Sequence, residues 1–204
     1  MANFFQNTRK PEGFGGKIMV ALMNGGHAPV AKWGMSHIAP KSTDTVLDAG
    51  CGGGANIALL LKKVVDGKVF GVDYSEVSVN KSLSLNKKAV AEGKCEIRQC
   101  SVSSLPFGDE TFDIITAFET VYFWQDLKNT FAEVRRTLKT GGTFMICNES
   151  DGHNPADEKW TSIIDGMSIY TAETLKSILI EAGFSKVDVD TNSKKHWLCV
   201  TAEK

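Results

Sequence analysis

Residues 45–56 read TVLDAGCGGGAN. Val46 and Leu47 are apolar, and they predict a short buried strand. The turn after this strand carries four glycines, and Gly50, Gly52 and Gly54 are the ones expected to shape the site. Glycine adopts backbone angles that other residues avoid, and it leaves room for a ligand against the main chain. Apolar residues then recur at helical spacing over residues 57–64, which predicts a helix whose free N–H groups point back at the turn. Such a strand–turn–helix unit is typical of a site for a nucleotide-like ligand.

A second strand is predicted over residues 68–73, where the sequence KVFGV ends in Asp73. An acid at the tip of the second strand of a β-α-β unit typically accepts hydrogen bonds from ribose hydroxyls. The glycine pattern also fits the G-x-G-x-x-G/A fingerprint of dinucleotide-binding proteins, so this pattern alone leaves NAD open as the ligand. Asp48, directly before the glycines, and the motifs further along the chain separate the two interpretations.

Further motifs follow in a fixed order. They are LPF at residues 105–107, TFDII at residues 111–115 and EVRRTLKTGGTF at residues 133–144. Together with VLDAGCGGG and VDYS, they resemble the ordered motifs of the class I S-adenosylmethionine-dependent methyltransferases, of the small single-domain, type-11-like kind. The resemblance covers residues 45–150 well. It implies S-adenosyl-L-methionine as the cofactor and methyl transfer as the activity.

Predicted strands and helices alternate along most of the chain. Strands are expected at residues 45–49, 68–73, 94–100, 112–118 and 142–148, and helices at residues 54–65, 75–91, 124–139 and 171–182. This alternation predicts a parallel, doubly wound α/β sheet with right-handed crossovers. Two last strands, at residues 186–190 and 196–202, are separated by too few residues for a parallel crossover, so we expect an antiparallel hairpin. The prediction is a doubly wound, seven-stranded, mostly parallel sheet with a reversed C-terminal strand, as the resemblance also implies.

The N-terminal region precedes this alternation. Two short helices are predicted at residues 17–23 and 28–38, broken near a pair of glycines. We expect residues 1–40 to form a helical cap and residues 41–204 to form the domain that binds S-adenosylmethionine. The first sixteen residues are polar and rich in glycine, and we expect them to be mobile unless they fold over another part of the protein.

Composition argues against several classes of protein. Lys and Arg total 23 against 24 Asp and Glu, so the net charge of −1 provides no general field for nucleic acid or an anionic membrane. No apolar run approaches the ~18 residues that span a bilayer. The five cysteines are odd in number and form no C-x-x-C pair, which favours free thiols in the cytoplasm. We therefore expect neither nucleic acid nor a membrane as a partner, and the oligomeric state stays open.

The expected cofactor site lies at the carboxyl ends of the strands, where open α/β sheets bind their ligands. The resemblance implies that Asp48 attracts the ammonium group of the cofactor and that Asp73 binds the ribose hydroxyls. The alternatives are a helix-capping role for Asp48 and a turn-stabilising role for Asp73. The residues expected to bind the cofactor are Asp48, Gly50, Gly52, Gly54, Asp73, Tyr74, Ser101, Val102 and Phe118.

One position departs from the family pattern. After the third strand the family usually has an acid that accepts a hydrogen bond from the adenine amino group. Ser101 and Val102 stand at this point, so a serine hydroxyl and a main-chain N–H group take the place of the acid. Phe118, at the tip of the fourth strand, is expected to contact the cofactor, whereas Phe123 and Trp124 are expected to begin the next helix and pack inward.

Methyl transfer from a sulfonium is an in-line displacement, in which the protein mainly aligns the nucleophile and excludes water. A base is needed only when the nucleophile arrives protonated. The candidates are His27, His37, Glu119, Tyr122 and His153. We favour His27, in the cap, together with Glu119 at the fourth strand, although a lone histidine is more often structural. The spacing of histidines and cysteines predicts no metal site.

Outside the core only the first forty residues and residues 149–170 remain, so we expect a small-molecule methyl acceptor enclosed between these segments. Two alternatives remain open. A non-catalytic module that binds S-adenosylmethionine is one, because the usual acid is missing at Ser101. An NAD-dependent oxidoreductase is the other, although such an enzyme has six parallel strands and usually a substrate domain, for which few residues remain.

Overall fold

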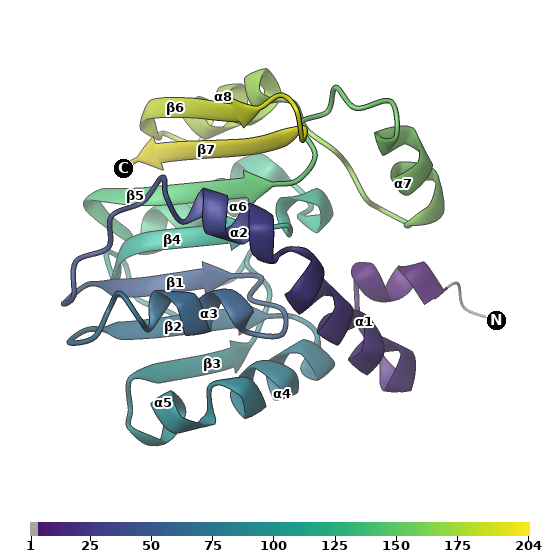
Figure 1. Cartoon of the computed structure of the whole chain (residues 1–204). Helices are drawn as coiled ribbons and strands as arrows, with labels where there is room; N and C mark the ends of the chain where they lie inside the picture. The colour runs from purple at the N-terminus through teal and green to yellow at the C-terminus, as the bar shows by residue number, and fades with distance from the viewer. Residues whose placement is uncertain (1–3) are drawn as a thin grey trace.

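Seven strands form one sheet across residues 4–204, the part of the chain that the computed structural model describes. Their order in the sheet is β3-β2-β1-β4-β5-β7-β6 (Figure 1). The strands are β1 (Thr45–Ala49), β2 (Lys68–Asp73), β3 (Cys95–Gln99), β4 (Phe112–Phe118), β5 (Leu138–Asn148), β6 (Ser185–Asn192) and β7 (Trp197–Glu203). Strands β1 to β5 run parallel, and β7 runs antiparallel to both β5 and β6. The expected doubly wound sheet with a reversed C-terminal strand is confirmed.

Helices cover both faces of this sheet (Figure 1). One face carries α2 (Ala28–Gly34), α3 (Ala55–Leu60), α4 (Glu76–Leu85) and α5 (Lys87–Ala91), and the other carries α6 (Leu127–Thr137) and α8 (Ala172–Glu181). The remaining helical elements are the 3-10 helices η1 (Phe4–Thr8) and η2 (Val121–Phe123), α1 (Gly13–Gly26) and α7 (Asp157–Ile163). Of these, η1, α1 and α7 lie beyond the carboxyl ends of the parallel strands, where open α/β sheets bind ligands.

The helix α6 shows how sequence leads to packing in this fold. Its N-cap residue Asp126 accepts a hydrogen bond from the N–H group of Asn129, which satisfies one free donor of the first turn. Leu127, Phe131 and Val134 share one face of the helix and are buried in the core against β4 and β5. Burial of each such side chain stabilises the fold by roughly 1.5–3 kcal/mol.

Several expected boundaries differ from the structure. The strand β5 begins at Leu138 and not at residue 142, because Leu138 already pairs with Phe112 of β4 across a register shift. The helix expected over residues 75–91 is interrupted at Asn86, whose side-chain amide donates to the carbonyl groups of Gly54 and Ser82. The helix expected over residues 54–65 ends at Leu60.

The N-terminal segment folds over the carboxyl edge of the sheet. The side-chain amide of Gln6, in η1, donates to the carbonyl of Ile163 in α7. The helix α1 begins at Gly13, earlier than expected, and His27 alone separates it from α2. Residues 1–3, also expected to be mobile, lie outside the described residues.

The helix α2 belongs to the main core. Val30, Ala31 and Met35 pack in one cluster with Val46 of β1 and Ile57 of α3. The proposed division at residue 40 stays a prediction, and this packing limits a separable cap to η1 and α1.

None of the helices within residues 4–204 is long and apolar enough to cross a bilayer. All five cysteines are free, as expected.

The contact between α2 and the sheet provides a test of this packing. A Cβ atom at Gly34 would lie 2.5 Å from Cys147 Sγ and 2.8 Å from Phe118 Cε1, so Gly34→Ala should lower the free energy of unfolding by about 1–3 kcal/mol. In the control Gly25→Ala, the added Cβ meets nothing within 4 Å, and stability should rise by up to about 1 kcal/mol. Urea unfolding of both variants measures the difference, and equal effects would contradict the close packing of α2.

Candidate cofactor and acceptor site

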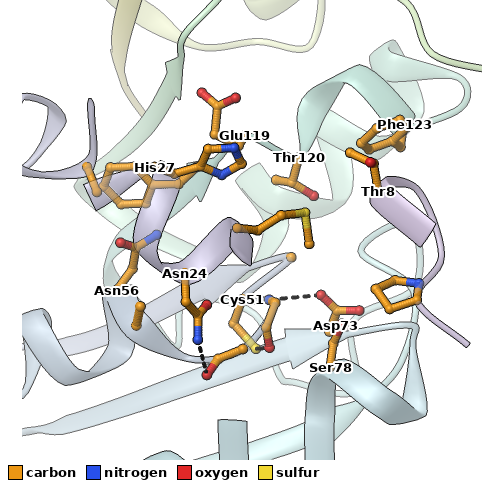
Figure 2. A pocket seen from close by; sticks show the side chains of 18 of the residues that line it. Thr8, Asn24, His27, Cys51, Asn56, Asp73, Ser78, Glu119, Thr120 and Phe123 are labelled. Atoms are coloured by element: carbon orange, nitrogen blue, oxygen red, sulfur yellow. Dashed lines mark hydrogen bonds between the residues drawn. The ribbon is translucent and has the colours of Figure 1, made fainter. Parts of the chain in front are cut away.

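The glycine loop between β1 and α3 is anchored on the tip of β2. The N–H groups of Gly50 and Cys51 both donate to the carbonyl of Val72, at 2.8 and 2.9 Å. The N–H group of Gly52 donates to Asp73 Oδ2 at 2.9 Å (Figure 2). The strand pairing between β1 and β2 is thereby continued into the loop, which holds the loop in one conformation.

Glycine is required at Gly50 because its φ is +78° and a Cβ there would lie 2.1 Å from the hydroxyl of Thr120. Gly54 has the same φ, and a Cβ there would lie 2.3 Å from the hydroxyl of Ser82. Gly52 differs, since its φ is +50° and a Cβ would meet nothing within 4 Å. The main chain at Gly52 therefore borders open space, as a loop that accepts a ligand requires.

Asp73 uses both carboxylate oxygens to hold backbone. Besides the Gly52 contact, Asp73 Oδ1 accepts from the N–H group of Ser75 at 2.8 Å. The side chain is mostly buried. Burial raises the pKa of this carboxyl above its usual value, and the N–H groups of Ser75 and Gly52 oppose the shift. Each oxygen has a second lone pair, so the carboxylate can still accept hydrogen bonds from a ligand.

Asp48 lies beneath the loop and not among the residues that line a cavity. Its Oδ1 accepts from the hydroxyl of Thr116 at 2.8 Å, and its Oδ2 has no hydrogen-bond partner among the described residues. Burial raises the pKa of Asp48 to about 7, and the charge of Asp73 adds to the shift. A buried carboxylate oxygen without a partner is costly, so Asp48 fits a neighbouring cation such as an ammonium group.

A cavity of about 240 Å³, here called the loop cavity, opens above the glycine loop. Its walls include five of the residues expected to bind the cofactor, namely Gly50, Gly52, Asp73, Tyr74 and Phe118. Beside it lies a cavity of about 270 Å³, here called the β3 cavity, whose walls include Ser101 and Val102. Asp73 and Tyr74 line both cavities, which therefore adjoin at the tip of β2. Gly54 shapes the loop but lines neither.

The chain before α1 closes the loop cavity over β2. The hydroxyl of Tyr74 donates to the carbonyl of Arg9, and the hydroxyl of Ser75 donates to the carbonyl of Pro11 at 2.8 Å. Burial raises the pKa of Tyr74 to about 12, so this hydroxyl keeps its proton at neutral pH. Arg9 and Pro11 also line the loop cavity. The sequence did not predict this closure.

A third cavity, of about 470 Å³ and here called the apolar cavity, lies between the N-terminal segment and α7. Its walls include apolar side chains from the N-terminal segment and from residues 160–169, in and after α7, namely Phe4, Phe5, Met19, Leu22, Met23, Trp160, Ile164, Met167 and Ile169. It shares five lining residues with the loop cavity, namely Thr8, Met23, His27, Glu119 and Phe123. The two cavities therefore meet along a common wall.

The structure brings the two favoured catalytic residues together at this wall, where Figure 2 shows the side chains of His27 and Glu119 next to each other. Glu149 joins them, with its N–H group donating to the Glu119 carboxylate and its Oε1 lying 3.8 Å from His27 Nε2. Burial raises the pKa of Glu119 well above its usual value, and the charge of Glu149 adds to this shift. Burial also lowers the pKa of His27, against the opposing effect of Glu149.

Glu149 was missed in the sequence, although a signal existed. Glu119 directly follows β4 and Glu149 directly follows Asn148, the last residue of β5. The parallel register pairs Phe118 with Cys147, so both acids leave the sheet at the same edge. His27, Glu119 and Glu149 place potential ligand atoms within 4.8 Å of one another. Three side chains that could hold a metal ion therefore lie together at this wall, whereas the spacing of histidines and cysteines predicted no metal site.

The other candidate bases lie elsewhere or are enclosed. His37 bonds Asp190 at 2.8 Å and the carbonyl of Trp33, away from the three cavities. His153 does not line them either, and Tyr122 lines the apolar cavity alone.

The structure differs from expectation at one of two aromatic side chains. Trp124 packs inward, as expected, with its ring stacked at 6.3 Å on Phe144. Phe123, expected to pack inward as well, is a wall of all three cavities. Trp124 also lines the β3 cavity, and neither residue begins the helix α6, which starts at Leu127.

Comparison with known proteins adds independent evidence. A family model described as a methyltransferase domain matches residues 47–146. An uncharacterized methyltransferase of Schizosaccharomyces pombe is 35% identical over 118 residues, which cover 54% of this chain and 41% of that protein. An O-methyltransferase of Penicillium expansum is 26% identical over 156 residues, which cover 74% of this chain and 56% of that protein. The chain spans about half the length of these curated relatives.

A solved structure supports the fold. A chain from the complex between the Haloferax volcanii Trm112 methyltransferase activator and a putative methyltransferase aligns with a TM-score of 0.80 at 20% identity, over 92% of this chain and 93% of that chain. The sheet order, the motifs on the glycine loop and the family match agree. Together these findings support a class I S-adenosylmethionine-dependent methyltransferase.

The site fits S-adenosyl-L-methionine, the cofactor of this family. Open space borders the main chain at Gly52, where the methionine portion requires close approach. The unpartnered oxygen of Asp48 suits an ammonium group, and the Asp73 carboxylate suits a ribose diol. The sheet does not fit an NAD-dependent oxidoreductase. In that fold six strands run parallel, whereas here β7 runs antiparallel to β5 and β6.

The buried carboxyl of Asp48 predicts a pH dependence of stability. With its pKa near 7, the folded protein holds a proton that the unfolded chain releases near pH 4. This stabilisation is complete below about pH 4 and is lost as the pH rises through 7. The variant Asp48→Asn keeps an acceptor for Thr116 and has no proton to lose, so its free energy of unfolding should exceed that of the wild type at pH 8 by up to about 4 kcal/mol.

Urea unfolding between pH 4 and pH 8, without cofactor, measures this difference. The exposed Asp66 supplies the control, and Asp66→Asn should follow the wild-type profile. Parallel profiles for Asp48→Asn and the wild type would contradict a protonated Asp48 in the folded protein.

Proposed function

We propose that the protein transfers the methyl group of S-adenosyl-L-methionine to a nucleophilic atom of a small, largely apolar acceptor. The observation that carries this proposal is the common wall of the loop cavity and the apolar cavity. A cofactor whose methionine portion lies on the glycine loop directs its sulfonium toward that wall. An acceptor in the apolar cavity then lies within reach of the methyl group.

In this proposal, each part of the cofactor has its own contacts. The ammonium group lies above Asp48, and the methionine portion lies against the loop of Gly50, Gly52 and Gly54. The ribose hydroxyls donate to Asp73, and the adenine enters the β3 cavity beside Tyr74, Ser101 and Val102. Phe118 lines the loop cavity near the sulfonium. The observed lining of the two cavities supports these roles for every residue except Asp48 and Gly54, which lie beneath the loop and within it.

The reaction itself is a single displacement. The nucleophile forms a bond to the methyl carbon, the carbon–sulfur bond breaks, and its electron pair stays on sulfur to give S-adenosylhomocysteine. The protein contributes alignment and exclusion of water, which together can lower the barrier by several kcal/mol. If the nucleophile is protonated, His27 and Glu119 are the groups placed to assist its deprotonation.

The apolar cavity indicates the kind of acceptor. Its volume of about 470 Å³ lies in the range of drug-sized ligand pockets. Its apolar walls suit a hydrophobic body, and the acids at its inner end suit a polar group that receives the methyl. The name O-methyltransferase of the Penicillium relative is consistent with a hydroxyl at that point. In this proposal η1 and α1 form the cap that covers the bound acceptor.

The cysteines and the net charge bear on the location of the protein and on its partners. Free cysteines suit a cytoplasmic enzyme. The near-neutral charge suits a small molecule better than nucleic acid or a membrane as the partner.

Removal of the Asp73 carboxylate tests cofactor binding. The variant Asp73→Ala should weaken binding of S-adenosylmethionine and S-adenosylhomocysteine at least 100-fold, about 2.7 kcal/mol, because two ribose hydroxyls lose their acceptor. Isothermal titration calorimetry measures the affinity. Asp66→Ala, at an exposed position, is the matched control. Asp73→Asn, which keeps one oxygen, should bind with intermediate affinity and separates loss of binding from loss of folding. Unchanged affinity in Asp73→Ala would show that the ribose assignment is wrong.

Obstruction of the apolar cavity tests the acceptor site. Ile169 lines this cavity and does not line the loop cavity. Ile169→Trp should therefore raise the KM for the acceptor at least tenfold and leave the affinity for S-adenosylmethionine within twofold. Ile180→Trp, on the exposed face of α8, is the control.

The acceptor for this assay comes from a first experiment. Methyl-labelled cofactor is incubated with the protein and a metabolite extract, and labelled products are identified by mass spectrometry. Cofactor binding without any labelled product across broad extracts would favour a non-catalytic binding module.

A further inference from the structure

We propose that His27, Glu119 and Glu149 bind one divalent cation at the common wall of the two cavities, and that this cation holds an oxygen nucleophile of the acceptor. The inference rests on the proposed function, because it assigns the acceptor to the apolar cavity. It goes further in naming a metal site and in restricting the reacting atom to oxygen.

The geometry of the three side chains is the first argument. They come from three separate elements, the break between α1 and α2, the end of β4 and the end of β5. Their potential ligand atoms lie within 4.8 Å of one another, and His27 Nε2 lies 3.8 Å from Glu149 Oε1. Ligands bind such ions at ~2.0–2.2 Å, so small side-chain rotations bring all three atoms onto one ion.

The charge of the cluster is the second argument. Within the described residues, neither Glu119 nor Glu149 forms an ion pair with a lysine or an arginine. Glu119 is enclosed between the two cavities, and its carboxylate meets the N–H group of Glu149. Two neighbouring carboxylates repel each other, and a divalent cation between them removes this repulsion.

A buried hydroxyl beside the cluster is an independent observation. Ser150 follows Glu149, and its side chain is mostly buried in the wall of the apolar cavity. Its Oγ has no hydrogen-bond partner within residues 4–204. A buried hydroxyl without a partner is costly, and it suits a ligand or an ion-bound water at this point. The unpartnered atom therefore indicates an occupant on the acceptor side of the cluster.

The position of the cluster determines what the cation does. Glu149 and Ser150 line the apolar cavity and not the loop cavity. The cluster therefore extends toward the acceptor side of the common wall. A cation lowers the pKa of a coordinated hydroxyl, whose proton passes to water at the exposed side of Glu149. The oxygen then attacks the methyl carbon, and the electron pair of the broken carbon–sulfur bond stays on sulfur.

The ligand set points to certain ions. One imidazole with two carboxylates suits Mn²⁺ and Zn²⁺ better than Mg²⁺, which prefers oxygen ligands alone, or Cu⁺, which prefers sulfur. Mn²⁺ is the most convenient probe because free and bound Mn²⁺ differ in their electron paramagnetic resonance spectra.

Titration of the 204-residue chain with Mn²⁺ tests the site without any acceptor. Both the protein and the buffers are first treated with a chelator to remove other metal ions. Wild-type protein should bind one Mn²⁺ per chain. Glu149→Gln and Glu119→Gln should each weaken this binding at least tenfold. Glu158→Gln, at an exposed acid of the nearby helix α7, should bind as the wild type does. S-adenosylmethionine affinity, measured on the same samples, should change less than twofold in Glu149→Gln, which shows that the variant is folded.

The outcomes distinguish this inference from the proposed function. Absence of Mn²⁺ and Zn²⁺ binding by the wild type, or equal binding by all the variants, overturns the metal site. If methyl transfer also continues at the same rate in excess chelator, the proposed function stands without the metal. If the wild-type protein does not bind S-adenosylmethionine, the proposed function is overturned instead. If the acceptor is an amine and its methylation is insensitive to chelator, the metal site is overturned. The two acids then bind an ammonium group instead.

Discussion

The site depends on one carboxylate, that of Asp73. It accepts hydrogen bonds from Gly52 in the glycine loop and from Ser75 at the start of α4, so it joins three consecutive parts of the β-α-β unit. Without this acceptor, the N–H groups of Gly52 and Ser75 would lose their partner, at a cost of about 1–3 kcal/mol for the buried Ser75. The same side chain lines both the loop cavity and the β3 cavity. One group therefore holds the loop in shape and faces the ligand.

The N-terminal segment, which covers the site, is held by the two residues that follow Asp73. Tyr74 and Ser75, directly after Asp73, hold the main chain at Arg9 and Pro11. Gln6 connects the other side of this segment to Ile163. The N-terminal segment is therefore fixed both to the cofactor side and to the acceptor side of the site. The hydrogen bond between Ser75 and Pro11 is buried, the one between Gln6 and Ile163 is partly buried, and the one between Tyr74 and Arg9 is exposed. The segment therefore covers the site from both sides.

The parallel sheet explains why acids gather beside the proposed methyl position. The carboxyl ends of β4 and β5 meet at one edge, so the residues that follow, Glu119 and Glu149, come together. Glu119 adopts a left-handed backbone conformation with φ of +55°, which is unfavourable for a residue with a side chain. This conformation directs its carboxylate to the wall between the cavities, where His27 completes the cluster. Backbone strain is thus found at the point where the chemistry is proposed.

The sequence by itself determined the sheet, because alternating apolar strands and amphipathic helices admit few topologies. It also determined the glycine loop and Asp73, whose roles depend on neighbours within one β-α-β unit. Only the tertiary structure decided the rest. Glu149, the closure by Arg9 and Pro11, and the exposure of Phe123 to the cavities depend on contacts between segments far apart in the chain. Local patterns such as hydrophobic period and turn chemistry carry no information about such contacts, because the packing of the whole sheet decides which loops meet at its edge.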